Sequence, residues 1–278
     1  MNKERGDCMN PLADVQLYLL DMDGTFYLDG VLLPGALEFL DKVRQTGKQY
    51  LFVTNNSSKN INTYWEKLNR LGAKVEKEDF LGSADATVMY LKKYYEFTDI
   101  LLIGTKDLEQ QFINAGYCLN PQNPKAVVLG FDTTIDYHKL TMLCSAVRAG
   151  LPYIATHPDL NCPVKDGFIP DIGAVIAFVK AATGREPDVV VGKPNPWIAL
   201  AAAQKANCNI EQLCMVGDRL YTDIALGQNC NLKTALVLCG ETTPEQAKTS
   251  EIKATVTVQN LKKVFLFHNF SDIIMGCI

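Results

Sequence analysis

The chain has 278 residues, of which 47% are hydrophobic and 21% are charged. A chain of this length is typical of one large domain or two domains of ordinary size, and the composition excludes an intrinsically disordered chain. The net charge of −4 at pH 7 provides no basic field for nucleic-acid binding. Small anions are not excluded, because a local site in an acidic protein can still be positive.

The nine cysteines form no metal-binding or redox motif. They include no C-x-x-C pair, which argues against a zinc ribbon or a thioredoxin motif, and we expect reduced, mostly buried side chains. Residues 1–14 have no apolar segment typical of a signal peptide. No window reaches the roughly 18 apolar residues of a membrane helix. We therefore expect a cytoplasmic protein with neither a membrane nor a nucleic acid as its partner.

Short apolar runs alternate with helical patterns along the chain. The first segments predict strand, helix, strand and helix in turn, at Val15–Leu20, Pro34–Thr46, Gln49–Val53 and Asn60–Leu71. Further strands are predicted at Asp99–Ile103, Ala126–Leu129, Pro152–Ala155, Asp188–Val191, Leu213–Val216, Thr234–Leu238 and Ala254–Val258. Further helices are predicted at Lys106–Ala115, Tyr137–Ala149 and Trp197–Ala206. The alternation predicts an α/β fold with a parallel sheet and helices on its faces.

Two aspartates, Asp21 and Asp23, follow the first predicted strand directly, within D-M-D-G-T. Ligand sites in open α/β sheets lie beyond the carboxyl ends of strands, and two carboxylates there can chelate a hard cation. A calcium-binding EF-hand loop is excluded, because Phe26 and Leu32 stand where that loop needs Gly and Glu. An ordinary turn is the alternative, since Asp and Gly both favour turns.

Two later strands also end in polar residues. The strand at 49–53 leads into Thr54, Asn55, Asn56 and Ser57, whose hydroxyls and amides suit either an anion or an ordinary helix cap. The strand at 188–191 leads into G-K-P, where Lys193 suits a phosphate or two crowded carboxylates. A solvated surface lysine is the alternative there.

The strand at 213–216 leads into G-D-R-L-Y-T-D, which contains Asp218 and Asp223. Asp218 can complete a cation site with Asp21, and Asp223 can be a further ligand, a supporting group or part of a helix start. Because the carboxyl ends of parallel strands share one sheet edge, all four groups can converge. A carboxylate, a hydroxyl, a cation and metal-binding acids are the components of phosphoryl transfer, in which a carboxylate can form an aspartyl-phosphate.

These motifs, in this order, resemble those of the haloacid dehalogenase-like superfamily, in its p-nitrophenylphosphatase-like and NagD-like branch. They are D-M-D-G-T (21–25), T-N-N-S-S (54–58), G-K-P (192–194) and G-D-R-L-Y-T-D (217–223). The resemblance covers nearly the whole chain. It implies a magnesium-dependent phosphatase of small phosphorylated metabolites, such as sugar phosphates or nucleotides. It also implies a Rossmann-like core with an inserted α/β cap domain.

The resemblance implies a role for each of these residues. Asp21 is the nucleophile and a Mg²⁺ ligand, and Asp23 is the general acid and base, which also holds Mg²⁺ through its backbone carbonyl. Thr54 and Asn55 hold the phosphoryl oxygens, and Lys193 neutralises Asp21 and the phosphate. The other implied site residues are Gly24 and Asn56 at the phosphate or substrate, and Asp218 and Asp223 at the metal.

The spacing of the motifs predicts where a second domain is inserted. The interval from Asp21 to Thr54 is too short for an extra domain, whereas that from Thr54 to Lys193 far exceeds one strand–helix unit. We expect the insert at 83–182 and the catalytic core at 1–82 and 183–278. The resemblance identifies the insert as a cap that excludes water and selects substrates.

Two residues of the predicted cap are candidate substrate contacts. His157 lies in A-T-H-P-D (155–159), where the family has A-T-N-P-D, and Asp171 lies in G-F-I-P-D-I-G-A (167–174). A solvated histidine and a turn are the respective alternatives.

Alternative functions are a phosphotransferase or phosphomutase with the same intermediate, and a non-catalytic protein that binds a phosphorylated ligand. Asp23 favours a phosphatase or mutase, because dehalogenases lack this second acid and transport ATPases carry Thr there. The position of the insert favours the phosphatase, since mutases usually carry a small helical cap after the first motif. Caps in this branch often dimerise, so a homodimer is one candidate state, and no sequence feature decides it.

Overall fold

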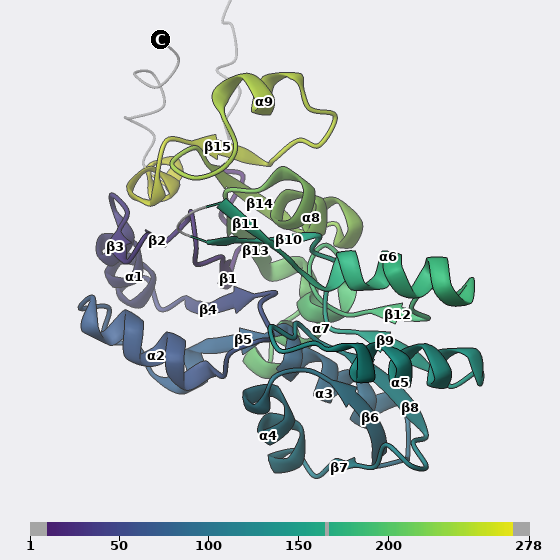
Figure 1. Ribbon diagram of the computed structural model, residues 1–278. Helices are drawn as coiled ribbons and strands as arrows, with labels where there is room; N and C mark the ends of the chain where they lie inside the picture. Colours follow the sequence, from purple (N-terminus) through teal and green to yellow (C-terminus); the bar gives the residue numbers. More distant parts are fainter. Residues whose placement is uncertain (1–9, 165–166, 269–278) are drawn as a thin grey trace, which may run out of the picture. The chain divides into compact units, whose positions relative to one another are not determined.

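The computed structural model describes residues 10–164 and 167–268, and the chain divides into two compact units. The first unit comprises residues 1–50 and 206–278, and the second comprises residues 51–205. Parallel strands with covering helices build both units, which confirms the predicted α/β class (Figure 1). The predicted insert at 83–182 lies wholly within the second unit, which contains more residues than the insert at both ends. The division into core and cap stays a prediction.

The sheet of the first unit places the ends of neighbouring strands together. Its parallel strands lie in the order β15 (Val256–Val258), β14 (Lys233–Val237), β13 (Leu213–Gly217) and β1 (Leu17–Leu20). Leu20 at the end of β1 pairs with Val216, and Gly217 at the end of β13 pairs with Leu236. All four residues of β1 are buried, as its uninterrupted apolar run predicts. The segments that follow β1, β13 and β14 therefore start side by side.

Helices and a hairpin complete the first unit. The hairpin pairs β2 (Tyr27–Leu28) with β3 (Val31–Leu32). The helix α1 (Ala36–Gln45) contacts the 3₁₀ helix η4 (Leu261–His268), where the rings of Phe39 and Phe265 lie 5.2 Å apart (Figure 1). The remaining elements are η2 (Ile210–Gln212), the π-helix η3 (Leu220–Ile224), α8 (Ala225–Cys230) and α9 (Pro244–Thr249).

The second unit contains two sets of parallel strands. The strand β4 (Gln49–Thr54), which starts in the first unit, pairs with β5 (Phe80–Gly82), so that Thr54 lies opposite Gly82. The other set lies in the order β12 (Val189–Val190), β9 (Tyr153–Ala155), β8 (Ala126–Leu129), β6 (Asp99–Ile103) and β7 (Cys118–Leu119). An antiparallel hairpin pairs β10 (Asn161–Val164) with β11 (Gly167–Pro170).

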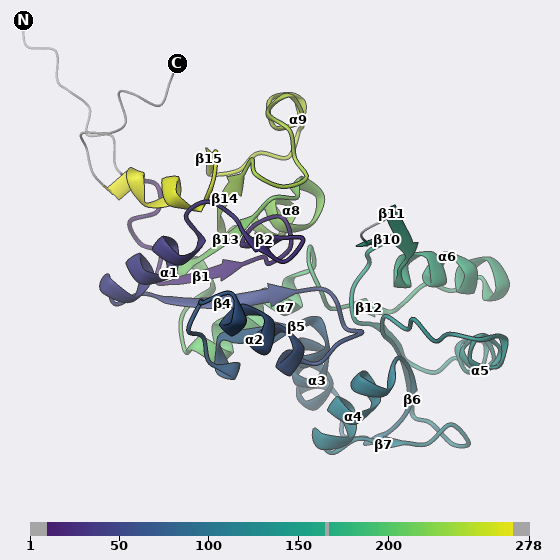
Figure 2. The same ribbon diagram turned by 60° about the vertical axis from the view of Figure 1, so that its left-hand side comes forward.

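Two helices cover one face of the five-stranded sheet. The helices α5 (Tyr137–Arg148) and α6 (Ile172–Thr183) share one apolar core with β6, β8 and β9, in which Val147 and Ile172 are buried. Figure 2 shows α4 (Lys106–Asn114) on the opposite face. The other helices of this unit are α2 (Ile61–Arg70), η1 (Lys77–Asp79), α3 (Ser83–Tyr94) and α7 (Pro196–Ala206).

The elements predicted from sequence are present; two strands match at both ends, and no end of the others is shifted by more than two residues. The sequence analysis gave no range for α3, α6, α8 or α9, for the short strands β5 and β7, or for the β10–β11 hairpin. The apolar residues of α6 cover most of its circumference, so its sequence has no clear helical periodicity. Within residues 10–164 and 167–268, no helix combines the length and the apolar composition needed to cross a membrane.

Candidate active site

Three carboxylates come together in the first unit, beyond the carboxyl ends of β1 and β13. Asp21 follows β1, and its N–H donates to the Val216 carbonyl at 2.9 Å. Asp218 follows β13 directly, and Asp223 lies within η3. One carboxylate oxygen from each aspartate lies within 4.8 Å of the other two. The structure thus brings together three of the residues predicted to hold a metal.

Hydrogen bonds fix the orientation of the Asp218 carboxylate. Its Oδ1 accepts from the Thr25 hydroxyl at 3.2 Å, and its Oδ2 accepts from the Glu241 N–H at 2.7 Å. Gly24 has a φ of +85°, in the left-handed region, and a Cβ there would run into this carboxylate. The glycine of D-M-D-G-T is therefore needed to leave room for Asp218. The binding of phosphate by Gly24 stays a prediction.

Asp223 is held in a similar way. It is fully buried, and its Oδ2 accepts from the Arg219 N–H at 3.1 Å. A Cβ at Gly217 would run into the Asp223 side chain, so this glycine also makes room for a carboxylate. The Arg219 Nε lies 2.9 Å from Glu241 Oε2, which links the segments that follow β13 and β14.

The electrostatics of the three carboxylates fit a divalent cation. Burial raises the pKa of Asp218 well above its ordinary value, and the nearby Asp21 and Asp223 raise it further. The three carboxylates therefore repel one another in a site that is largely buried. Carboxylate oxygens are the donors that Mg²⁺ prefers, and a divalent cation would offset the mutual repulsion. The donor set of this structure therefore fits the predicted Mg²⁺.

Asp23 has a different environment from these three aspartates. It is exposed, and its Oδ2 accepts from the Tyr27 hydroxyl at 3.0 Å. This hydrogen bond orients the Asp23 carboxyl group toward Tyr27, which lies at the start of the β2–β3 hairpin. Its carboxylate is not part of the cluster of three, and the binding of metal through its carbonyl stays a prediction.

In the second unit, Asn55 holds the backbone of Lys193. Its Oδ1 accepts from the Lys193 N–H at 2.8 Å, and its Nδ2 donates to the Lys193 carbonyl at 2.9 Å. The same Nδ2 donates to Asp159 Oδ1 at 3.0 Å. A Cβ at Gly192 would lie only 2.5 Å from Asn55 Oδ1, so glycine is required beside Lys193. The side-chain amide of Asn55 thus positions the lysine, and its contact with a phosphoryl oxygen stays a prediction.

Thr54 and Asn56 form the turn around Asn55. The Asn56 N–H donates to Thr54 Oγ1 at 3.1 Å, and Asn56 Oδ1 accepts from the Ser58 N–H at 2.9 Å. Lys193 is 3% exposed, and its Nζ lies 3.5 Å from the Val53 carbonyl. The surface-lysine alternative for Lys193 is therefore wrong. The structure brings Asn55 and Lys193 together. Thr54 and Asn56 are the chain neighbours of Asn55.

His157 and Asp171 are both buried in the second unit. His157 Nε2 and Asp171 Oδ1 lie 3.6 Å apart, and Asp159 Oδ2 lies 3.6 Å from His157 Nδ1. Burial lowers the pKa of His157 to about 4 and raises that of Asp171 to about 7. The solvated-histidine alternative is wrong, because His157 is 0% exposed. Contact of either residue with a substrate stays a prediction.

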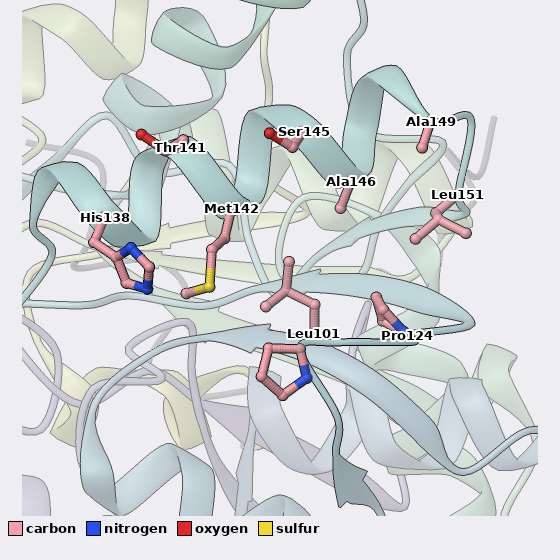
Figure 3. Close-up of a pocket in the computed structure, with 10 residues that line it drawn as sticks. Leu101, Pro124, His138, Thr141, Met142, Ser145, Ala146, Ala149 and Leu151 are labelled. Atoms are coloured by element: carbon pink, nitrogen blue, oxygen red, sulfur yellow. The ribbon is translucent and has the colours of Figure 1, made fainter.

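A cavity of about 310 Å³ lies elsewhere in the second unit, along one side of α5 (Figure 3). His138, Met142 and Ala146 of α5 line it, opposite Leu101 and Pro124. Its lining includes neither a lysine or arginine nor a carboxylate. This composition does not suit a phosphorylated substrate, and none of the predicted site residues lies in it.

The sequence analysis assigned no role to four residues that organise these groups: Thr25, Arg219 and Glu241 around the acidic cluster, and Asp159 beside Asn55. Glu241 follows a strand end, β14, so the rule applied to the other strand ends would have identified it. Asp159 gave no comparable signal, because its partner Asn55 is far away in sequence.

Comparison with known proteins assigns the family. The model of the haloacid dehalogenase-like hydrolases matches residues 18–118, and a HAD-hydrolase-like model matches residues 190–264. The acid sugar phosphatase of Staphylococcus aureus is 32% identical over 253 residues, which cover 91% of this chain and 97% of that protein. The chain belongs to the haloacid dehalogenase-like hydrolases.

Solved structures place it more narrowly in this family. The 4-nitrophenylphosphatase of Thermotoga maritima is 43% identical with a TM-score of 0.89, covering 93% of this chain and 98% of that one. A putative NagD protein is 42% identical with a TM-score of 0.86, covering 92% and 99%. The predicted p-nitrophenylphosphatase-like and NagD-like branch is confirmed, as is the enzyme class, a phosphoric monoester hydrolase.

Proposed function

We propose that this haloacid dehalogenase-like hydrolase is a magnesium-dependent phosphatase that transfers the phosphoryl group of a small metabolite to Asp21 and then to water. The observation that carries the proposal is the cluster of Asp21, Asp218 and Asp223, in which three oxygens lie within 4.8 Å of one another. Such a cluster is costly to bury without a cation, and its strand-end position is that of the ligand sites of α/β proteins.

Asp21 is the nucleophile in this proposal. A carboxylate oxygen of Asp21 attacks phosphorus, the bond between phosphorus and the ester oxygen breaks, and an aspartyl-phosphate forms. In the second step water attacks phosphorus, the bond to Asp21 breaks, and inorganic phosphate leaves. Asp21 is half-buried, and its backbone is fixed by the hydrogen bond to Val216, so the carboxylate is held at the strand end.

Asp23 moves the protons in both steps. As a carboxylic acid it protonates the departing ester oxygen, and as a carboxylate it then takes a proton from the attacking water. Asp23 gives up a proton in the first step and gains one in the second, so it ends in the protonated state in which it started. The hydroxyl of Tyr27, 3.0 Å from Asp23 Oδ2, orients the carboxyl group for these transfers. Positioned proton transfer of this kind contributes about 10²–10⁴-fold to a rate.

Asp21, Asp218 and the backbone carbonyl of Asp23 would hold Mg²⁺, with Asp223 in support. When bound, the ion supplies positive charge that offsets the negative charge of the phosphoryl oxygens. Asp218 and Asp223 keep their orientation through the hydrogen bonds from Thr25, Glu241 and Arg219.

The residues of the second unit bind the phosphoryl group in this proposal. Lys193 supplies a buried positive charge, and Thr54 and Asn56 lie in the turn beside its support, Asn55. The proposed role of these residues in phosphoryl transfer rests on the family assignment and on the order of the motifs. Residues 83–182 act as the cap, in which His157 and Asp171 contact the substrate.

Sugar phosphates are the substrate class that we propose. The relative from Staphylococcus aureus is named an acid sugar phosphatase and spans almost the same length as this chain. We also propose a cytoplasmic location, because the seven cysteines within the described residues form no disulfide. Two of these cysteines are buried, four are partly buried and one is exposed, so the expectation of mostly buried cysteines is wrong.

Trapping the intermediate tests this proposal. The protein is mixed with Mg²⁺ and a sugar phosphate, quenched in acid and analysed by peptide mass spectrometry. We expect one added phosphoryl group on the peptide that contains Asp21, and none in Asp21→Asn. Turnover without any phosphorylated peptide, or a label on another residue, would contradict the assignment of Asp21.

A further inference from the structure

We infer that His157, Asp159 and Asp171 form a second cation site, which binds a divalent transition-metal ion of the Zn²⁺ type within the second unit. One potential ligand atom from each residue lies within 4.8 Å of the other two. The site differs from the acidic cluster of the first unit in its residues and in its donors. His157 and Asp171 are also the proposed substrate contacts, so the inference deepens that part of the proposed function, whereas the metal-binding tests below do not require turnover.

The imidazole of His157 provides the observation that points to a ligand. His157 is 0% exposed, and its buried Nε2 has no hydrogen-bond partner in the structure. Its other nitrogen, Nδ1, lies 3.4 Å from the Asp159 N–H, which is a long and weak hydrogen bond. Nε2 can bind an ion when the proton of the neutral ring lies on Nδ1, which is 3.6 Å from Asp159 Oδ2. A buried polar nitrogen without a partner is unfavourable, and it lies 3.6 Å from Asp171 Oδ1.

The charge state of the cluster suits a metal ligand set. Burial lowers the pKa of His157 to about 4; Asp159 raises it and Lys193 lowers it further, so the imidazole is neutral at pH 7. Neutral imidazole is the form that coordinates metals. Burial raises the pKa of Asp171, and the negative charge of Asp159 also raises it. A cation bound between Asp159 and Asp171 would offset the repulsion between these two residues.

The backbone holds the three residues in place before any ion binds. The Asp171 N–H donates to the Leu160 carbonyl at 2.9 Å, and the Gly173 N–H donates to the Asp159 carbonyl at 2.8 Å. These bonds tie the segment that follows β9 to the start of α6. A Cβ at Gly173 would approach the Asp159 carbonyl to 2.8 Å, so glycine permits this close contact.

The spacing of the donors is close to that of a tetrahedral site. Bonds of about 2.1 Å to nitrogen and oxygen place tetrahedral ligands about 3.4 Å apart. The distance of 3.6 Å between His157 Nε2 and Asp171 Oδ1 nearly matches this value. The Asp159 carboxylate can move closer to the bound ion, because its side chain is 15% exposed.

The donor set also indicates which ion binds. An imidazole with two carboxylates suits Zn²⁺ and its transition-metal neighbours, whereas the all-carboxylate cluster of Asp21, Asp218 and Asp223 suits Mg²⁺. We therefore expect the two clusters to prefer different ions. The cluster of His157, Asp159 and Asp171 should bind Zn²⁺ or Co²⁺ at concentrations well below those at which it binds Mg²⁺.

Titration with Co²⁺ tests the inference, with Asp218→Asn as the background that weakens the first cluster. We expect about one Co²⁺ per chain, with weak visible absorption bands and no near-ultraviolet thiolate band. Adding His157→Gln or Asp171→Asn should lower the affinity at least about tenfold, as losing one of three ligands implies. His138→Gln is the matched control, since His138 is an exposed histidine of α5 that lines the separate cavity. It should change nothing.

Thermal unfolding provides a second reading that does not depend on activity. Zn²⁺ at a hundredfold excess over Kd should raise the Tm of the chelator-treated parent by roughly 5 °C, and should leave His157→Gln unchanged. Melting in chelator first shows that each variant is folded, and Asp171→Asn replaces His157→Gln if the latter is not. Absence of Co²⁺ binding, binding that survives both substitutions, or a thiolate band would overturn the inference.

Discussion

Replacing Asn55 with alanine should lower the unfolding free energy of the second unit by about 4 kcal/mol. The substitution removes the two hydrogen bonds of 2.8 and 2.9 Å that satisfy the buried N–H and carbonyl of Lys193. A buried backbone group without a partner costs about 1–3 kcal/mol, so two such groups cost about 4 kcal/mol. The bond to Asp159 is half-buried and adds less, because water can replace it.

Urea unfolding followed by tryptophan fluorescence measures this effect. The only two tryptophans of the chain, Trp65 and Trp197, both belong to the second unit, so their signal reports on the part that contains Asn55. Asn56→Ala is the matched control. Its Oδ1 accepts only within its own turn, from Ser58, and its half-buried amide can exchange protein partners for water. We expect the control to lose about 1 kcal/mol.

Asn55→Asp separates the hydrogen bonds from the volume of the side chain. It keeps an acceptor for the Lys193 N–H, but it removes both donor bonds and places a carboxylate beside that of Asp159. It should therefore destabilise at least as much as alanine at pH 7. If Asn55→Ala and Asn55→Asp both cost less than about 1 kcal/mol, or no more than Asn56→Ala, the role of Asn55 as the support of Lys193 is refuted.

Three further predictions concern single residues. Asp23→Asn should reduce kcat by about 10²–10⁴-fold, whereas Tyr27→Phe, which removes only the orienting hydroxyl, should reduce it less than tenfold, both measured by phosphate release; equal losses would contradict the separate roles. Gly24→Ala should lower both Tm and activity, because its left-handed φ and the Asp218 carboxylate leave no room for a Cβ; a wild-type Tm would refute this. Burial raises the pKa of Asp171 to about 7, so the folded protein keeps a proton that the unfolded chain loses near pH 4. The unfolding free energy from this carboxyl should therefore fall as pH rises from about 4 to about 7 in EDTA, and Asp171→Asn should remove that part of the decline in urea unfolding at pH 5 and 7; an unchanged decline would contradict the shift.

The strands and the acids beyond their ends could be predicted because both are local patterns. The uninterrupted apolar run of β1 fixes a buried strand, and Asp21 stands directly after it. The parallel order of β1 and β13 then places Asp218 beside Asp21, since Leu20 pairs with Val216. One local rule, applied at two strand ends, was therefore sufficient to predict two members of the acidic cluster.

The role of Asn55 could not be predicted from local pattern. An asparagine after a strand suits a helix cap, an anion or a long-range partner equally well. Its amide pairs with the backbone of Lys193, which lies 138 residues later in the chain. Only the packing of the second unit decides that choice, because both groups are buried and each satisfies the other.

The burial of His157 could not be predicted from local pattern either. The segment A-T-H-P-D is polar and follows a strand, which is typical of an exposed turn. The structure buries the imidazole completely against Asp171, a residue from beyond the next hairpin. Burial of this kind depends on how α6 packs on the five-stranded sheet, and that helix has no clear periodicity in the sequence.

The most direct test of the central claim is phosphate release from a panel of phosphorylated metabolites, measured with Mg²⁺, with EDTA, and with Asp21→Asn in place of the parent protein. We predict release that requires Mg²⁺, is greatest for sugar phosphates and is abolished in Asp21→Asn, whose amide cannot act as the nucleophile. Release that persists at full rate in EDTA or in Asp21→Asn would contradict the account.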